Sequence, residues 1–269
     1  MTGNPFRSVP PQPDRQTAHL ADSAGTPWSG RLLTSTGFDG DTGAADPELL
    51  YALSDRARRP SPQADARLVD VAGPARWVVP VVALLGDGET GPHGQTVDKS
   101  TDMAVVTLTA PDGRRALPVF TSVAALGTWQ PHARPVPVDG ARAASAALAE
   151  GCQVIVVDLA SDHAQELRSS QVWAMARRQP WLPAHTDPIV TQAVSEATHE
   201  ERHLHAYRLE EGSPAGSGQL RVVLTLRPGL TAQAVQGILA RVGERLAENG
   251  EFRMRVDELS LALETTATR

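Results

Sequence analysis

Residues 110–122 read Ala-Pro-Asp-Gly-Arg-Arg-Ala-Leu-Pro-Val-Phe-Thr-Ser and contain a turn, a strand and a helix start in direct succession. Pro-Asp-Gly is a turn signal, because proline fixes φ and glycine accepts backbone angles that other residues avoid. Residues 114–120 continue as a strand whose apolar side chains Leu117, Val119 and Phe120 are expected to face a core. Ser122 can cap a short helix over residues 123–126.

Two strands precede this turn. Residues 77–85 form a short, mostly apolar run, and residues 103–109 are rich in valine and threonine. Together with residues 114–120 they predict an antiparallel meander. Further upstream, Asp46-Pro47 marks the start of a helix over Pro47–Arg58, because an acidic cap followed by proline in the first turn is a typical helix beginning.

Strands and helices alternate downstream of the turn. Residues 135–138 predict a short strand, and residues 141–150 an alanine-rich helix that ends at Gly151. Residues 154–159 are aliphatic on both faces, which predicts a central, buried strand. A helix over residues 164–178 follows, so helices are expected to pack on the sheet.

A second set of elements follows the proline-rich stretch 180–188, in the expected order helix 189–201, strands 204–210 and 220–226, helix 231–248 and a strand-like segment at 252–263. We therefore predict an α+β protein with a mixed sheet, an antiparallel meander and packed helices, plus a second, smaller α+β domain. The predicted division is a flexible, proline-rich arm at residues 1–25, a larger domain at 26–183 and the smaller domain at 184–269.

The segment at 110–122 resembles the core signature of the N-terminal domain of the SseB family. The same pattern is carried by three other segments: WVVPVVA at 77–83, RPVPV at 134–138 and the lead-in GDTGAADP at 40–47. Residues 185–264 are similar to the SseB C-terminal domain, most clearly at LRPGL, 226–230. Arginine far outnumbers lysine, and alanine, glycine and proline are all abundant, which indicates a high-GC bacterial genome. The chain resembles an actinobacterial-type member of the family.

The resemblance implies a cytosolic protein and supplies no catalytic residues. The family takes its name from an enhanced serine sensitivity phenotype, so the expected role is non-enzymatic binding or regulation connected with amino-acid metabolism or stress. No cofactor is expected. An alternative is a small-molecule sensor that binds its ligand in a pocket between the two predicted domains. The expected partner is an unknown protein, or a second copy of the chain bound through the exposed edge of the C-terminal sheet.

Composition and charge exclude several function classes. The formal net charge of −6 disfavours nonspecific nucleic-acid binding, which needs a basic surface. The longest apolar stretch, 77–85, is far too short to cross a bilayer, and residues 1–20 do not resemble a signal peptide. Cys152 is the only cysteine, so nothing indicates an oxidising compartment, and the cytoplasm is the expected location.

Arg114, Arg115 and Arg134 are the candidate ligand-binding residues. A turn does not need an arginine pair, and guanidinium groups bind carboxylates and phosphates. The alternative is that these charges lie on a solvated edge strand and prevent sheet-to-sheet aggregation.

Two short segments match the sequence motifs of known active sites. His199-Glu200-Glu201-Arg202-His203 spells HExxH, in which His199 and His203 would bind zinc and Glu200 would activate water. Its charged surroundings favour a solvated helix end, so a zinc hydrolase is an alternative rather than the expected function. The glycine motif at 86–91 spells GxGxxG but is followed by Pro-His-Gly rather than a helix, which disfavours a dinucleotide site.

Overall fold

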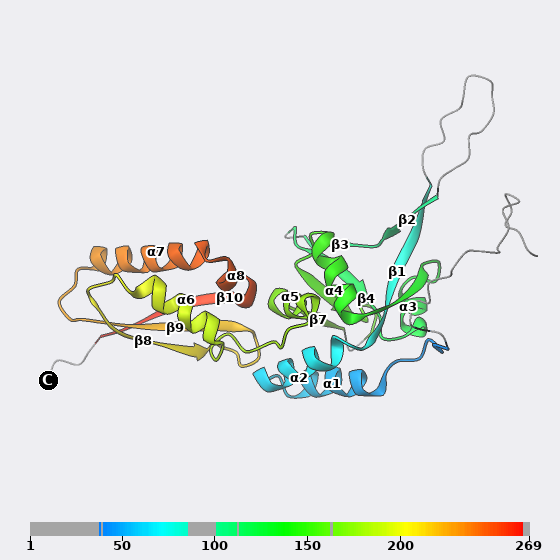
Figure 1. Ribbon diagram of the computed structural model, residues 1–269, viewed down its shortest axis with the longest axis horizontal. Coiled ribbons are helices and arrows are strands. Elements are labelled where there is room, and N and C mark those ends of the chain that lie inside the picture. Colours follow the sequence, from blue (N-terminus) through cyan, green and yellow to red (C-terminus); the bar gives the residue numbers. More distant parts are fainter. Residues whose placement is uncertain (1–37, 39, 86–100, 112, 162–163, 266–269) are drawn as a thin grey trace, which may run out of the picture. The chain divides into compact units, whose positions relative to one another are not determined.

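The computed structural model in Figure 1 describes residue 38 and residues 40–85, 101–111, 113–161 and 164–265. The predicted arm at 1–25 and the glycine motif at 86–91 lie outside these ranges, as does Asp112 of the predicted turn. The ends of that turn are described: the Gly113 amide donates to the Ala110 carbonyl at 2.9 Å, and Gly113 has a φ of +85°. The position therefore needs the conformational freedom of glycine, as expected.

Two helices begin the described chain, where the sequence predicted one. Helix α1 (Pro47–Arg58) has the predicted bounds, and the Asp46 carboxylate accepts the Glu48 amide at 2.8 Å. Helix α2 (Pro62–Ala72) was not predicted. It begins by the same device as α1, since Ser61 caps it and Pro62 occupies its first turn.

The strands up to residue 167 form two sheets. One has the order β2-β1-β5, from β1 (Arg76–Leu85), β2 (Thr101–Val105) and β5 (Arg134–Asp139), all antiparallel. The other has the order β3-β4-β6-β7, from β3 (Leu108–Thr109), β4 (Arg115–Val119), β6 (Val154–Val157) and β7 (Gln165–Leu167). Strands β4 and β6 are parallel, and the other pairs in this sheet are antiparallel.

The mixed, partly antiparallel sheets and packed helices confirm the predicted α+β class. The predicted meander differs in detail, because the run at 103–109 divides into β2 and β3, which belong to different sheets. Strands β1 and β4 therefore lie in different sheets and not in one meander as predicted. They are joined by a single bridge, in which Val78 and Phe120 exchange backbone hydrogen bonds of 2.9 Å.

Helices α3 (Val123–Trp129), α4 (Gly140–Ala149) and α5 (Ser169–Arg177) complete this part. The predicted helix at 164–178 was wrong at its start, because residues 165–167 extend the sheet as β7 before α5 begins. Helices α1, α2, α4 and α5 enclose one hydrophobic core with the strands; its largest members include Trp77, Leu68 and Ile155.

The remaining elements are α6 (Pro188–Thr198), β8 (Leu204–Glu211), β9 (Gln219–Leu226), α7 (Ala232–Glu248), α8 (Gly250–Arg255) and β10 (Glu258–Thr265). Their sheet has the order β10-β9-β8, with β9 antiparallel to β8 and parallel to β10. Alternate residues of β9, from Leu220 to Leu226, pack with α6, α7 and α8 in a second core, so the helices cover one face of this sheet (Figure 1). Helix α8 was not predicted.

The first core ends in the sequence at Trp181, and the second begins at Ala184. The described residues from 40 onward nevertheless form one compact unit by their contacts. The predicted boundary near residue 184 therefore stays a prediction. In the described part of the chain, no helix is both long and apolar enough to cross a membrane.

Candidate functional site

A buried group of charges lies where α2, α5 and the segment before β10 meet. The Asp65 carboxylate on α2 is almost fully buried and accepts from Arg56 at 2.7 Å and from Arg168 at 2.8 Å. The Arg168 guanidinium also donates to Asp257 at 2.9 Å. Burial alone would lower the pKa of Arg168, but hydrogen bonds and charge from Asp65 and Asp257 outweigh it and raise the pKa. Arg168 is therefore charged and paired with both carboxylates.

Asp257 connects this group to the start of α5. Its carboxylate accepts the Ser170 amide and the Ser170 hydroxyl, both at 2.8 Å, and the same hydroxyl accepts the Trp181 indole N–H at 2.9 Å. Gly218 approaches Arg168 so closely that a β-carbon there would lie 2.3 Å from Nε. The Arg168 network, by which we mean Arg56, Asp65, Arg168, Ser170 and Asp257, has its charged groups paired with one another. The cavity beside it has a volume of only about 20 Å³, so the network has structural rather than ligand-binding geometry.

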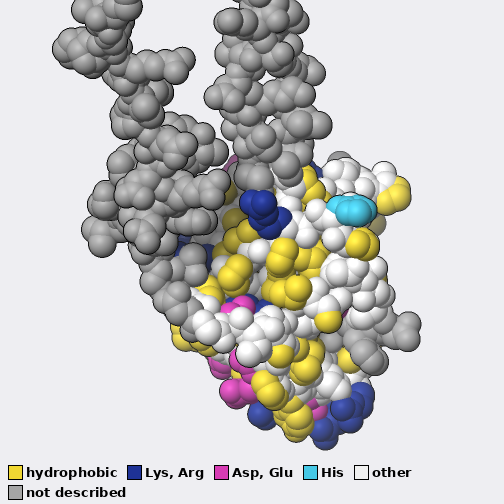
Figure 2. Space-filling model, turned by 90° about the vertical axis from the view of Figure 1, so that its right-hand side faces the viewer, with side chains coloured by type: hydrophobic (Ala, Val, Ile, Leu, Met, Phe, Trp, Pro, Cys, Tyr) yellow, Lys and Arg dark blue, Asp and Glu magenta, His cyan; other side chains and the backbone are white. Residues whose placement is uncertain are grey.

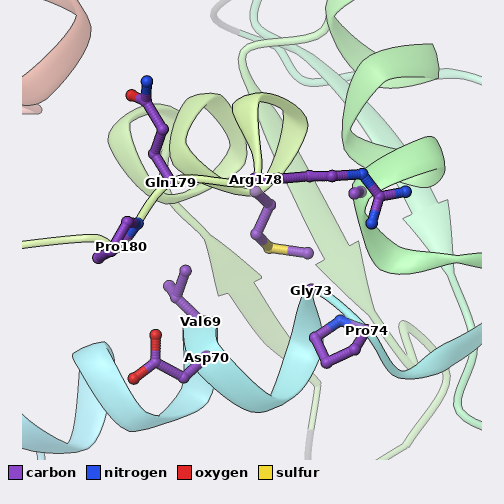
Figure 3. Close-up of a pocket in the computed structure, with 9 residues that line it drawn as sticks. Val69, Asp70, Gly73, Pro74, Arg178, Gln179 and Pro180 are labelled. Carbon is purple, nitrogen blue, oxygen red and sulfur yellow. The ribbon is translucent and has the colours of Figure 1, made fainter.

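Two cavities lie on either side of the segment that follows α5. The first, the α2–α5 pocket, has a volume of about 280 Å³. Figure 3 shows that α2 and the turn after it form one wall, and that the end of α5 forms the opposite wall with Arg178, Gln179 and Pro180. Asp70 and Arg178 extend in different directions in this view, so their charges do not converge on one point.

Arg178 has an unusual backbone conformation beside this pocket. It ends α5 in the left-handed region, with φ of 54° and ψ of 39°, where glycine is the usual residue. Its amide donates to Met175 and its guanidinium to both oxygens of Asp139, at 3.2 and 3.3 Å. Asp139 in turn caps α4. The strained cap therefore has a structural use, because the arginine side chain ties α5 to the start of α4.

The second cavity, the Trp173 pocket, has a volume of about 390 Å³ and is lined by residues of α5, of the proline-rich segment, of α6 and of α8. Its walls are largely apolar: Trp173 and Trp181 contribute aromatic rings, and Leu182 and Ile189 are exposed hydrophobic side chains at its edge. Exposed apolar side chains grouped around a cavity are typical of a binding site rather than of ordinary surface.

Arg255 is the charged group of the Trp173 pocket. Its guanidinium carbon lies 4.6 Å from the centre of the Trp173 ring, a cation–π distance. Its Nε lies 3.3 Å from Asp187, the cap of α6, and its Nη1 donates to Glu251 at 2.6 Å. The side chain is only 13% exposed. The pocket therefore combines an apolar wall with a fixed, mostly buried cation.

The three predicted ligand-binding arginines have different neighbours in the described part of the chain. Arg114 lies 3.6 Å from Glu166 of β7, and the Arg115 side chain donates to Thr107 at 3.3 Å. Arg134 begins β5 in the other sheet, opposite Val81 of β1. On the described part of the face in Figure 2, arginine side chains are scattered among hydrophobic and uncharged ones. The binding role of these arginines stays a prediction.

The predicted zinc motif has no helical spacing. Helix α6 ends at Thr198, so His199 is its cap and His203 immediately precedes β8. The Glu200 carboxylate accepts from Arg245 at 2.8 Å. Within the described ranges, no group of three or more His, Cys, Asp and Glu side chains lies close enough together to hold a metal ion. Among the described residues, no third side chain joins His199 and His203 to complete a zinc site.

Glu201 of the same motif is held by arginines. Its carboxylate accepts from Arg241 at 3.0 and 2.7 Å and from Arg245 at 3.2 Å. The hydrogen bond from Arg241 lowers the pKa of Glu201 below its ordinary value near 4.5, and the charges of both arginines act in the same direction. The motif therefore has a stabilising ion pair at its centre, which packs α7 against the end of α6.

This pairing predicts a pH dependence of stability. A carboxyl whose pKa is lowered by folding stabilises the protein above its unfolded pKa and loses that contribution as the pH falls through the folded value. Glu201→Gln should therefore be less stable than the unchanged protein at pH 7, and the difference should shrink as the pH falls below about 4.5. Urea unfolding at a series of pH values measures this. Glu200→Gln is the control, since Glu200 is 75% exposed; an equal effect there would contradict the assignment.

The edges of the C-terminal sheet, the predicted interaction surface, are β8 and β10. Strand β8 has a bulge between Leu204 and Ala206, a feature that protects edges from added strands. Strand β10 pairs regularly with β9, and its Leu263 is exposed. Binding of a partner or a second copy along β10 stays a prediction.

Sequence reasoning missed the Trp173 pocket because its cation, Arg255, lies far along the chain from the stretch 170–189 that supplies the other lining residues. The only sequence signal was the proline-rich stretch at 180–188 between the predicted domains.

Cys152 behaves as expected for a small buried side chain: burial raises the pKa of its thiol, which disfavours the reactive thiolate.

Taken together, the mixed sheets, the packed helices and the two cores define an α+β protein with cavities beside α5. Residues 49–174 match the family model of the SseB protein N-terminal domain. This match supports the SseB family for residues 49–174, which contain the predicted signature at 110–122. The likeness of residues 185–264 to the SseB C-terminal domain and the actinobacterial type stay predictions. Comparison of the chain with curated proteins and with solved structures gave no match.

Proposed function

We propose that this protein is a non-enzymatic, cytosolic binding protein that takes a small molecule in the Trp173 pocket and has a regulatory role. The observation that carries the proposal is the composition of that pocket. A cavity of about 390 Å³ with aromatic walls and few polar groups falls within the size range of small-molecule sites. The family name supports amino-acid metabolism or stress as the process that is regulated.

The position of the pocket in the chain supports a sensing role. Its walls include Trp173 of the SseB N-terminal domain and Ile189 and Arg255 from beyond the predicted boundary near 184. A ligand that contacts both segments would stabilise their observed arrangement relative to any arrangement that separates them. Binding would thereby change the population of states that a partner protein could recognise.

The first test is a thermal-shift experiment on the full chain with a set of small cellular metabolites. A ligand that binds only the folded state raises the melting temperature; at one hundred times its Kd the rise should be roughly 5–10 °C. Trp173→Ala should abolish the rise measured against that variant's own melting temperature. Tyr51→Ala is the control, because Tyr51 is a 53% exposed aromatic residue of α1 that does not line the pocket.

Two outcomes would contradict the proposal. One is a rise that survives in Trp173→Ala, which would place the ligand elsewhere. The other is a reproducible turnover of any metabolite in the set by the purified protein, which would make it an enzyme. A ligand whose effect is lost in Trp173→Ala and kept in Tyr51→Ala supports the pocket as the site.

A further inference from the structure

We propose that the ligand of the Trp173 pocket is a small organic anion, a carboxylate attached to an apolar or aromatic body, and that Arg255 binds its carboxylate. This inference rests on the proposed function, since it names the class of ligand for the same site. It is drawn from the hydrogen-bond donors, the charges and the apolar walls of the pocket.

The hydrogen bonds of Arg255 leave donors for a ligand. A guanidinium carries five N–H donors. Nη1 donates to Glu251, and Nε lies beside Asp187, but Nη2 makes no hydrogen bond with any residue in the described ranges. In the described ranges the only fully buried side-chain nitrogen or oxygen without a hydrogen-bond partner is Gln171 Nε2, so Nη2 of Arg255 is accessible to solvent. A charged acceptor that replaces water there forms a strong, short bond. The pocket therefore has a place for an oxygen that carries negative charge.

The carboxylates of the pocket do not prevent this. Asp187 is already engaged, because it accepts the Ile189 amide at 2.8 Å as the cap of α6 and faces Arg255. Glu251 is 62% exposed, so solvent screens its charge. A second guanidinium, Arg177, lies 5.8 Å from the centre of the Trp173 ring but does not line the pocket. The cation that an incoming anion would meet in the pocket is therefore Arg255.

The rest of the lining selects the body of the ligand. Trp173, Trp181, Leu182 and Ile189 offer aromatic and aliphatic surface, and the remaining walls include two prolines. Burial of apolar surface here contributes to binding in proportion to its area, whereas a bare inorganic anion would leave these walls uncovered. A carboxylate with a ring or a branched chain satisfies both the cation and the walls.

The test compares two probes of the same shape, phenylacetate and its neutral amide, phenylacetamide. Binding to the full chain is followed by tryptophan fluorescence and by calorimetry. Phenylacetate should bind at least about tenfold more tightly, because only the anion forms charge-assisted hydrogen bonds. Arg255→Gln should remove this preference.

A second variant keeps the test independent of folding. Glu251→Gln changes only an exposed partner of Arg255 and frees a donor on Nη1, so it should tighten the binding of phenylacetate and leave that of phenylacetamide unchanged. The variant Arg59→Gln, in an exposed ion pair on α1, is the control and should change neither.

Each result decides something. Equal binding of the two probes would overturn the anion assignment and leave the pocket as a binding site. Absence of binding by both probes would also overturn the assignment, and the proposed function would then stand only if the metabolite set yields a ligand that depends on Trp173. A preference for phenylacetate that survives in Arg255→Gln would assign the anion to another cation.

Discussion

Gly140→Ala is expected to destabilise the protein by about 3 kcal/mol or more, the upper part of the range for overpacked sites. Gly140 is the first residue of α4, and a β-carbon there would lie 1.9 Å from the Ala72 carbonyl oxygen and 2.8 Å from Nε1 of Trp77. Neither atom belongs to a flexible side-chain end. The carbonyl accepts the Trp77 indole N–H at 2.8 Å, and Trp77 is 1% exposed.

The backbone around Gly140 cannot shift easily to make room for the added methyl group. The Gly140 amide donates to Ala75 and the Ala141 amide to Gly73, both at 3.0 Å, so the start of α4 is fixed to the turn after α2. Moving α4 outward would break these bonds and the Trp77 contact together. The melting temperature should fall by roughly 6–12 °C, which thermal and urea unfolding measure.

Gly127→Ala is the matched control. Gly127 lies in α3, is exposed, and a β-carbon there would meet nothing within 4 Å. Because alanine is the better helix former, this change should stabilise the protein by about 0.5–1 kcal/mol. If Gly140→Ala and Gly127→Ala had similar effects, the close approach of α4 to Ala72 would not exist in solution.

Asp65→Ala is the second change with a large expected effect. It removes the carboxylate that pairs with Arg56 and Arg168, whose side chains are 15% and 11% exposed. Removal of one partner from a buried ion pair leaves an uncompensated buried charge and costs about 3–5 kcal/mol. Urea unfolding at neutral pH should show a loss of this size.

The control is an ion pair on the neighbouring helix. Asp55 pairs with Arg59 at 2.6 Å, but Arg59 is 78% exposed, so Asp55→Ala should cost at most about 1 kcal/mol. Asp65→Asn separates charge from volume, because it keeps the side-chain size and one acceptor. A loss for Asp65→Ala no larger than that for Asp55→Ala would show that the Arg168 network does not stabilise the fold.

The elements that the sequence predicted well have local causes. Helix α1 follows from Asp46-Pro47, the turn before β4 from Gly113, and β6 from four consecutive aliphatic residues that the structure places inside a sheet. Helix α2 had an equally local cause in Ser61-Pro62. Prolines at 60 and 62 are as typical of a helix end as of a helix start, so the pattern alone does not separate the end of α1 from the start of α2.

Other features depend on contacts that sequence patterns do not carry. Residues 103–109 divide between two sheets because the first part pairs with β1 and the second with β4. Residues 165–167 likewise form β7 rather than the start of α5 because they pair with β6. The same is true of the candidate site. Trp173 and Arg255 are 82 positions apart, and nothing in their local sequence marks either as part of a pocket. The predicted arginines at 114, 115 and 134 stood out only because a turn and a strand did not need them.

The pairing of Arg168 with Asp257 bears on how much of the chain can stand alone. The SseB N-terminal domain ends at residue 174 by sequence comparison. Asp257, 83 positions beyond that limit, supplies one of the two carboxylates that neutralise Arg168. The same carboxylate accepts the amide of Ser170. A polypeptide that stopped at residue 183 would keep Asp65 and Arg168 and lose Asp257. The domain recognised by sequence comparison is thus smaller than the part of the chain needed to neutralise Arg168. The segment after residue 174 supplies a charge that the preceding domain needs.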